Sequence, residues 1–89
     1  MVKDAYIDYK ETGRTIQWFR ERKGLTRTYV ADVIGTHHQV VSSWELGQYL
    51  PSLGNAIRLA DLFGVSVEDF VIQRMECEAY DSMAKEDAI

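Results

Sequence analysis

The chain has 89 residues, 46% apolar and 11% aromatic, which suffices for one domain with a modest core. The chain has a single cysteine, so no internal disulfide is expected. It shows neither a signal-peptide pattern nor an apolar stretch of transmembrane length, and a cytoplasmic protein is therefore predicted. The net charge of −4 argues against a protein that binds nucleic acid through overall charge alone.

The first helix is predicted to follow a short N-terminal arm. Residues 1–11 are too few to fold alone and are expected to form this arm. Thr12 is a plausible N-cap for the helix, and Gly24 is expected to end it. From Arg14 to Arg27 the sequence holds five basic residues and one acidic residue, so a local positive field can arise in an acidic chain.

Residues 26–47 predict two short helices joined by a tight turn. Thr26 is expected to cap the helix that ends at Ile34, and the next helix is expected from about 37 to 46. Small, flexible and bulky apolar residues occupy the positions such a pair requires: Ala31, Gly35, Val41 and Trp44. This is the layout of a helix-turn-helix, whose second helix lies in the DNA major groove.

Two further helices are predicted after the loop that contains Pro51. Ser52 is expected to cap the fourth helix, and Ser66 with Asp69 resembles the capping box of a fifth. The expected apolar stripe of the fourth helix consists of Leu53, Ala56, Ile57, Ala60 and Phe63. Five helices without a strand pattern predict an all-α domain over residues 12–71.

Residues 72–89 are predicted to be an acidic tail or an extension of the fifth helix. They hold two basic and five acidic residues. Apolar residues recur every four positions into this segment, which indicates a packing stripe: Val67, Val71, Met75, Ala79 and Met83. Cys77 is expected to be an inert thiol, because acidic neighbours disfavour its thiolate.

The polar start of the third helix holds the residues with recognition chemistry. With Val41 and Trp44 buried, the exposed residues are expected to be His38, Gln39, Ser42 and Ser43. Glutamine can bond an adenine edge with two hydrogen bonds, serine can donate or accept at any base, and histidine can donate to guanine. Arg27, in the first turn of the second helix, could reach a phosphate.

Residues 14 to 70 closely resemble the lambda-repressor-like helix-turn-helix domains of the phage repressor, Cro and XRE regulators. The matching residues are Ile16, Arg20, Gly24, Leu25, Thr26, Val30, Ala31, Ile34, Gly35, Val41, Ser42, Trp44, Glu45, Gly47, Pro51, Ser52, Leu59, Ala60, Phe63, Gly64, Val65 and Phe70. The resemblance implies the five-helix fold of that family, with its second and third helices as the helix-turn-helix.

The resemblance also implies roles for individual residues. Base reading falls to His38, Gln39 and Ser43. Arg20 and Glu45 match a structural ion pair between the first and third helices. Contacts to the DNA backbone or beside the bases fall to Thr26, Arg27, Thr36, His37, Ser42 and Gln48.

The expected function is sequence-specific binding of double-stranded DNA by a small transcriptional regulator. A repressor acting as a homodimer on a pseudo-palindromic operator, at the nucleoid, fits best. No catalytic constellation, cofactor or metal site is indicated, since the adjacent His37 and His38 point about 100° apart on a helix.

Two alternatives stay open. The acidic tail would suit an antitoxin-type autorepressor that binds a toxin partner. Leu46 stands where the family often has Arg or Asn, and the loop of residues 48–50 lacks basic residues. These departures would suit a protein-interaction module that has lost DNA binding, with an apolar patch formed by Leu46, Tyr49 and Leu50 as core cover or as a dimer contact.

Overall fold

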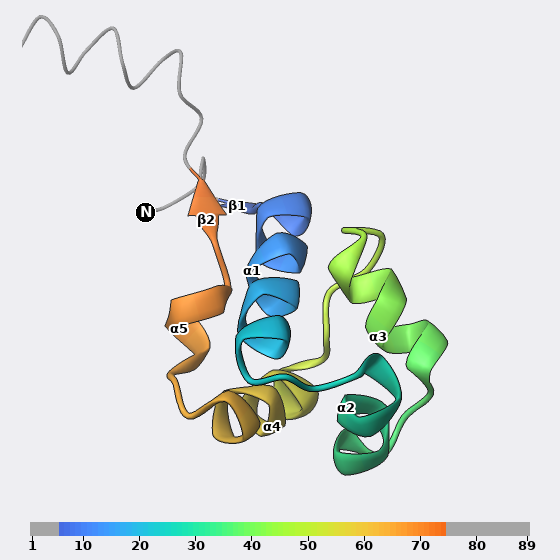
Figure 1. Cartoon of the computed structure of the whole chain (residues 1–89). Helices are drawn as coiled ribbons and strands as arrows, with labels where there is room; N and C mark the ends of the chain where they lie inside the picture. Colours follow the sequence, from blue (N-terminus) through green and yellow to red (C-terminus); the bar gives the residue numbers. More distant parts are fainter. Residues whose placement is uncertain (1–5, 75–89) are drawn as a thin grey trace, which may run out of the picture.

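A computed structural model describes residues 6–74. In chain order the helices are α1 (Tyr9–Arg22), α2 (Arg27–Ile34), α3 (His38–Glu45), α4 (Leu53–Phe63) and α5 (Val67–Phe70). Figure 1 shows α1 between α3 on one side and α5 on the other, and α2 beside α3. The expected all-α arrangement is confirmed. Within the described range, no helix combines the length and the apolar character needed to cross a membrane.

The first helix begins earlier than the sequence predicted. Helix α1 starts at Tyr9, and its N-cap is Asp8, whose carboxylate accepts the backbone N–H of Glu11 at 2.9 Å. The expected cap, Thr12, is instead buried, and its Oγ1 accepts the backbone N–H of Ile72 at 2.9 Å. Both residue types favour caps, so the tertiary contact of Thr12 decided between them.

The two ends of the described chain meet in a short antiparallel pair. Strand β1 (Tyr6–Ile7) pairs with strand β2 (Gln73–Arg74), with Tyr6 opposite Arg74. Just inside this pair, the backbone N–H of Asp8 donates to the carbonyl oxygen of Ile72 at 2.7 Å. The sequence had predicted no strands, and two strands of two residues carry no periodic signal.

Helix α5 does not continue into the tail over the part that the structure describes. It ends at Phe70, and Val71 is already extended with a ψ of 111°. The possible helical extension is therefore wrong for residues 72–74, because the backbone of Ile72 bonds to Asp8 and to Thr12 of α1 instead. Residues 1–5 and 75–89 lie outside the described residues, as do Cys77 and the stripe positions Met75, Ala79 and Met83.

The core lies where the helices meet, around the aromatic ring of Phe63. This ring stacks on Phe19 with centroids 5.7 Å apart and meets Phe70 edge-on at 6.3 Å. The fully buried apolar side chains are Ile16, Val30, Val41, Leu59 and Phe70. Those of Ala31, Ile34, Trp44, Ala56, Ala60 and Phe63 are nearly so.

The predicted stripe of α4 is partly wrong. Ala56, Ala60 and Phe63 are buried as expected, but Leu53 is 75% exposed and Ile57 is 49% exposed. The buried face runs through positions 56, 59, 60 and 63, which follow the helical repeat. Leu53 and Ile57 lie on the outer side of that face, so α4 carries apolar side chains into solvent.

Candidate nucleic-acid interface

The α2–α3 pair is formed by local capping at both ends of α2. Thr26 Oγ1 accepts the backbone N–H of Tyr29 at 3.0 Å, which begins the helix. Gly35 has a φ of 93°, a left-handed conformation that glycine adopts without strain. The backbone N–H groups of Gly35 and Thr36 both donate to the carbonyl oxygen of Ala31, at 2.8 and 2.9 Å. The chain thereby turns directly into α3 (Figure 1).

The two faces of α3 have opposite character. Val41 is fully buried, Trp44 is 3% exposed, and Ala31 of α2 is 2% exposed. These side chains, with the turn at Gly35, hold α3 against α2 and the core. His38 and Gln39 at the start of α3 are exposed and form no side-chain hydrogen bond within residues 6–74. Their polar atoms are free to contact a ligand.

The serines of α3 are less accessible than the sequence predicted. Ser42 and Ser43 are half-buried rather than exposed. Ser43 Oγ donates to the carbonyl oxygen of Val40 at 2.6 Å. A serine side chain is short and bonds back to its own helix easily, whereas His38 and Gln39 reach beyond the helix surface. Ser43 therefore has acceptor capacity left, but its proton is already used.

The residues expected to flank the bases lie at the starts of α2 and α3 and in the loop after α3. His37 is the N-cap of α3, is exposed, and makes no capping hydrogen bond with its side chain. Thr36 is half-buried, and Gln48, in the loop after α3, is exposed. Thr26 is exposed, although its hydroxyl oxygen caps α2. The expected flanking residues thus lie near both ends of α3 as well as at the start of α2.

A buried ion network joins α1, α2 and α3. Arg20 Nε donates to Glu45 Oε2 at 2.6 Å, and Arg20 Nη2 donates to Glu45 Oε1 at 3.3 Å. Arg27 Nε donates to the same Oε1 at 2.8 Å. Arg20 also donates through Nη1 to the carbonyl oxygen of Leu25 at 2.8 Å. Arg20 and Glu45 therefore form the expected kind of pair, and Arg27 joins it as a third member.

The link between Arg27 and Glu45 is the interaction that the sequence did not reveal. The two residues are 18 positions apart and lie on different helices. The resemblance to the family placed Arg27 at the start of the second helix and paired Glu45 with Arg20. A signal existed in that combination, because one carboxylate that faces two arginines can accept hydrogen bonds from both guanidinium groups.

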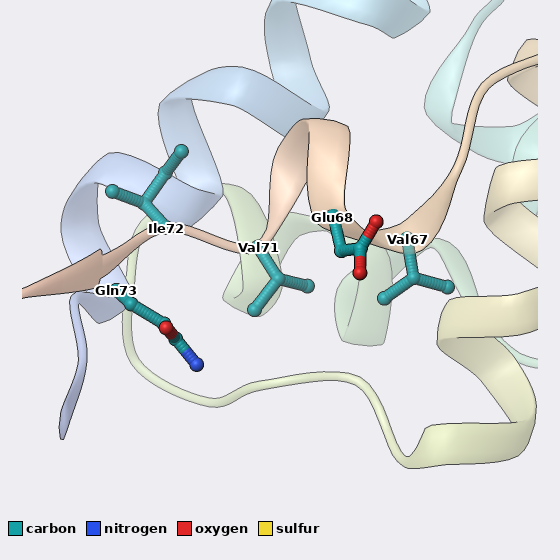
Figure 2. Close-up of a pocket in the computed structure, with 5 residues that line it drawn as sticks. All are labelled: Val67, Glu68, Val71, Ile72 and Gln73. Carbon is teal, nitrogen blue, oxygen red and sulfur yellow. The ribbon is translucent and has the colours of Figure 1, made fainter. Parts of the chain in front are cut away.

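A hollow beside α5 offers no comparable chemistry. It is lined by Val67, Glu68, Val71, Ile72 and Gln73, of which Glu68 is the single charged residue. Figure 2 shows Val71 and Ile72 pointing to opposite sides of the extended segment. In the described range, no three His, Cys, Asp or Glu side chains lie close enough together to hold a metal ion. The α2–α3 pair therefore remains the candidate site.

Comparison with known proteins identifies the same segment. The family model for helix-turn-helix domains matches residues 16–70, which include all of α2, α3 and α4. An uncharacterized HTH-type transcriptional regulator of Methanocaldococcus jannaschii is 35% identical over 57 residues, which are 64% of this chain and 86% of that protein.

Solved structures share the fold. The restriction-modification controller protein C.AhdI from Aeromonas hydrophila has a TM-score of 0.66 and 27% identity, over 71% of this chain and 91% of that one. The P22 c2 repressor protein, solved with a synthetic operator, has a TM-score of 0.64 over 66% of this chain and 89% of its own. Its 19% identity indicates likeness of fold alone, and the expected lambda-repressor-like fold is confirmed. The chain belongs to the helix-turn-helix family of HTH-type transcriptional regulators, which is not a family of enzymes.

Proposed function

We propose that this protein is a sequence-specific binder of double-stranded DNA that represses transcription as a homodimer at the nucleoid. The observation that supports this most is the exposed, unpaired pair His38 and Gln39 at the start of α3. These two residues lie on a helix whose opposite face is buried through Val41 and Trp44. A helix held in this way can enter the major groove with its N-terminal residues at the base edges.

The residues divide into base-reading and backbone-contacting groups. Gln39 suits an adenine, His38 suits a guanine or a phosphate, and Ser43 offers acceptor capacity to a base. The backbone or flanking contacts are assigned to Thr26, Arg27, Thr36, His37, Ser42 and Gln48. Backbone contacts set the register and base contacts provide the specificity.

A homodimer would place two recognition helices about one helical turn of DNA apart on a pseudo-palindrome. Exposed apolar side chains near the site support the idea that a second copy binds. Leu46 is 62% exposed and Tyr49 is 67% exposed, so they do not serve as core cover. Leu50 is half-buried beside them.

The same exposed residues favour one alternative, a protein-interaction module without DNA binding. Leu46 and Tyr49 stand next to the recognition helix, where basic residues would strengthen backbone contacts. The antitoxin alternative depends on the acidic tail, most of which lies outside the described residues. Co-purification of a small basic partner, lost when the tail is removed, would support it.

The deciding experiment is selection of bound sequences from a random pool of DNA duplexes at low salt. DNA binding predicts an enriched, symmetric sequence, and its symmetry reports the dimer. The variant Arg27→Ala/Gln39→Ala/Ser43→Ala should then lose specific affinity while its circular dichroism spectrum stays unchanged. A matched control is Arg14→Ala/Gln17→Ala/Thr15→Ala on the outer side of α1. No enrichment by the wild type, or equal affinity of the first variant, contradicts the proposal.

A further inference from the structure

Glu45 holds two arginines with one buried carboxylate. The Glu45 side chain is 2% exposed, that of Arg20 is 9% exposed, and that of Arg27 is 45% exposed. Three of the hydrogen bonds on Glu45 come from these two guanidinium groups. Arg20 Nη2 also lies 3.7 Å from the exposed carboxylate of Glu21, so two positive and two negative charges meet here. Because the side chains of Arg20 and Glu45 are buried, the guanidinium of this group that an anion in solution can reach is that of Arg27.

The guanidinium of Arg27 is held by one edge and open at the other. Its Nε is bonded to Glu45, whereas its two Nη groups form no hydrogen bond with any residue in the range 6–74. Arg27 is the first residue of α2, where backbone N–H groups without helical partners also lie. The start of α2 therefore carries a cation held in one orientation, with two N–H-bearing nitrogens available to an anion.

We propose that Glu45 is a positioning residue for DNA binding: it holds Arg27 through Nε so that both Nη groups bond one phosphate. This rests on the proposed function. Positive and negative groups then alternate from Arg20 through Glu45 and Arg27 to the phosphate. Since Glu45 ends α3 and Arg27 begins α2, the phosphate contact also determines where α3 lies along the groove.

The arrangement requires arginine at position 27. A guanidinium is planar and presents five N–H donors on three nitrogens, so it can bond a carboxylate and a phosphate on different edges. A lysine carries the same charge on one nitrogen and cannot match this fork geometry. Charge alone and positioning by Glu45 therefore predict different results for Arg27→Lys.

The test uses the full chain and the duplex enriched by selection, with fluorescence anisotropy measured over a range of salt concentrations. Arg27→Lys should weaken binding about tenfold although the charge is kept. Glu45→Gln makes the protein more positive by one charge, so a field effect alone would strengthen binding. Positioning predicts instead that binding weakens about tenfold and that the slope of log affinity against log salt falls by about one.

Matched controls come from an exposed pair of the same chemistry on α1. Arg14 bonds Glu11 at 2.7 Å, and their side chains are 69% and 36% exposed. Arg14→Lys and Glu11→Gln should leave affinity and salt slope unchanged, apart from the small field effect of the added charge. This pair shows what loss of a surface salt bridge does by itself.

The outcomes separate the two proposals. Failure of the wild type to bind any duplex at low salt contradicts the proposed function. The positioning role alone is overturned if the wild type binds the duplex and the Arg27→Lys variant binds it with the same affinity. It is also overturned if the Glu45→Gln variant binds more tightly than the wild type. If Glu45→Gln fails to fold, because Arg20 is then buried without its partner, Arg27→Lys still decides, since it leaves the Arg20–Glu45 pair in place.

Discussion

A methyl group added at Gly13 would lie 2.6 Å from the backbone carbonyl oxygen of Glu45. Helices α1 and α3 therefore touch through their backbones at this point, with no side chain between them. Arg20 lies two helical turns beyond Gly13 on α1, and at this separation of the helices its guanidinium reaches the Glu45 carboxylate. Gly13 thus determines the helix spacing on which the buried ion network depends.

Gly13→Ala should destabilise the protein. The methyl group overpacks a backbone contact, which costs about 1–3 kcal/mol, whereas the better helix propensity of alanine returns at most about 1 kcal/mol. Urea denaturation followed by circular dichroism measures the difference. The control is Gly54→Ala in α4, where no atom lies within 4 Å of the added methyl group, and stability should be equal or up to about 1 kcal/mol higher. Equal stabilisation by both changes would contradict the close contact.

Arg20→Met should be among the most damaging single changes outside the apolar core. It leaves the carboxylate of Glu45 buried with only the half-exposed Arg27 as partner. Removal of one member of a buried pair costs about 3–5 kcal/mol. Arg14→Met removes an exposed pair with Glu11 and should cost less than about 1 kcal/mol. Thermal and urea unfolding of the two variants should differ accordingly, and similar midpoints would show that the network contributes little.

Thr12→Val tests the contact between α1 and the segment after α5. Valine keeps the shape of the side chain but cannot accept the N–H of Ile72, so stability should fall by about 1–2 kcal/mol. The Ile72 amide should also exchange its hydrogen faster in the variant. Thr15→Val is the control, because Thr15 Oγ1 only adds a bond to the helical carbonyl of Glu11, and the change should stay within about 0.5 kcal/mol. An unchanged exchange rate at Ile72 would rule out this contact in solution.

Gly35→Ala should destabilise the helix-turn-helix through backbone conformation alone. Nothing lies within 4 Å of the added methyl group, but a φ of 93° disfavours any side chain. The expected loss is about 1–2 kcal/mol for alanine and less for asparagine, which tolerates the left-handed region better. Thermal unfolding of the two variants gives the ranking. If the Gly35→Ala variant is as stable as the wild type, the turn relaxes to another conformation.

Local patterns in the sequence were enough to predict the helix-turn-helix scaffold. Ala31, Gly35, Val41 and Trp44 all lie in α2, in α3 or in the turn between them, so helical periodicity and turn chemistry identify them. The division into an arm of residues 1–11, a domain of 12–71 and a tail of 72–89 stays a prediction. So do the roles of His38, Gln39 and Ser43 toward bases.

The sequence by itself therefore determined five helices, their order and the polar start of α3 at His38 and Gln39. Tertiary structure decided the start of α1, the end of α5, the exposure of Leu53 and Ile57, and the partner of Arg27. The physical reason is distance along the chain: Thr12 meets Ile72 60 positions away, and Arg27 meets Glu45 18 positions away. Caps and periodicity act within a few residues, but a hydrogen bond between distant residues exists only after the helices have packed.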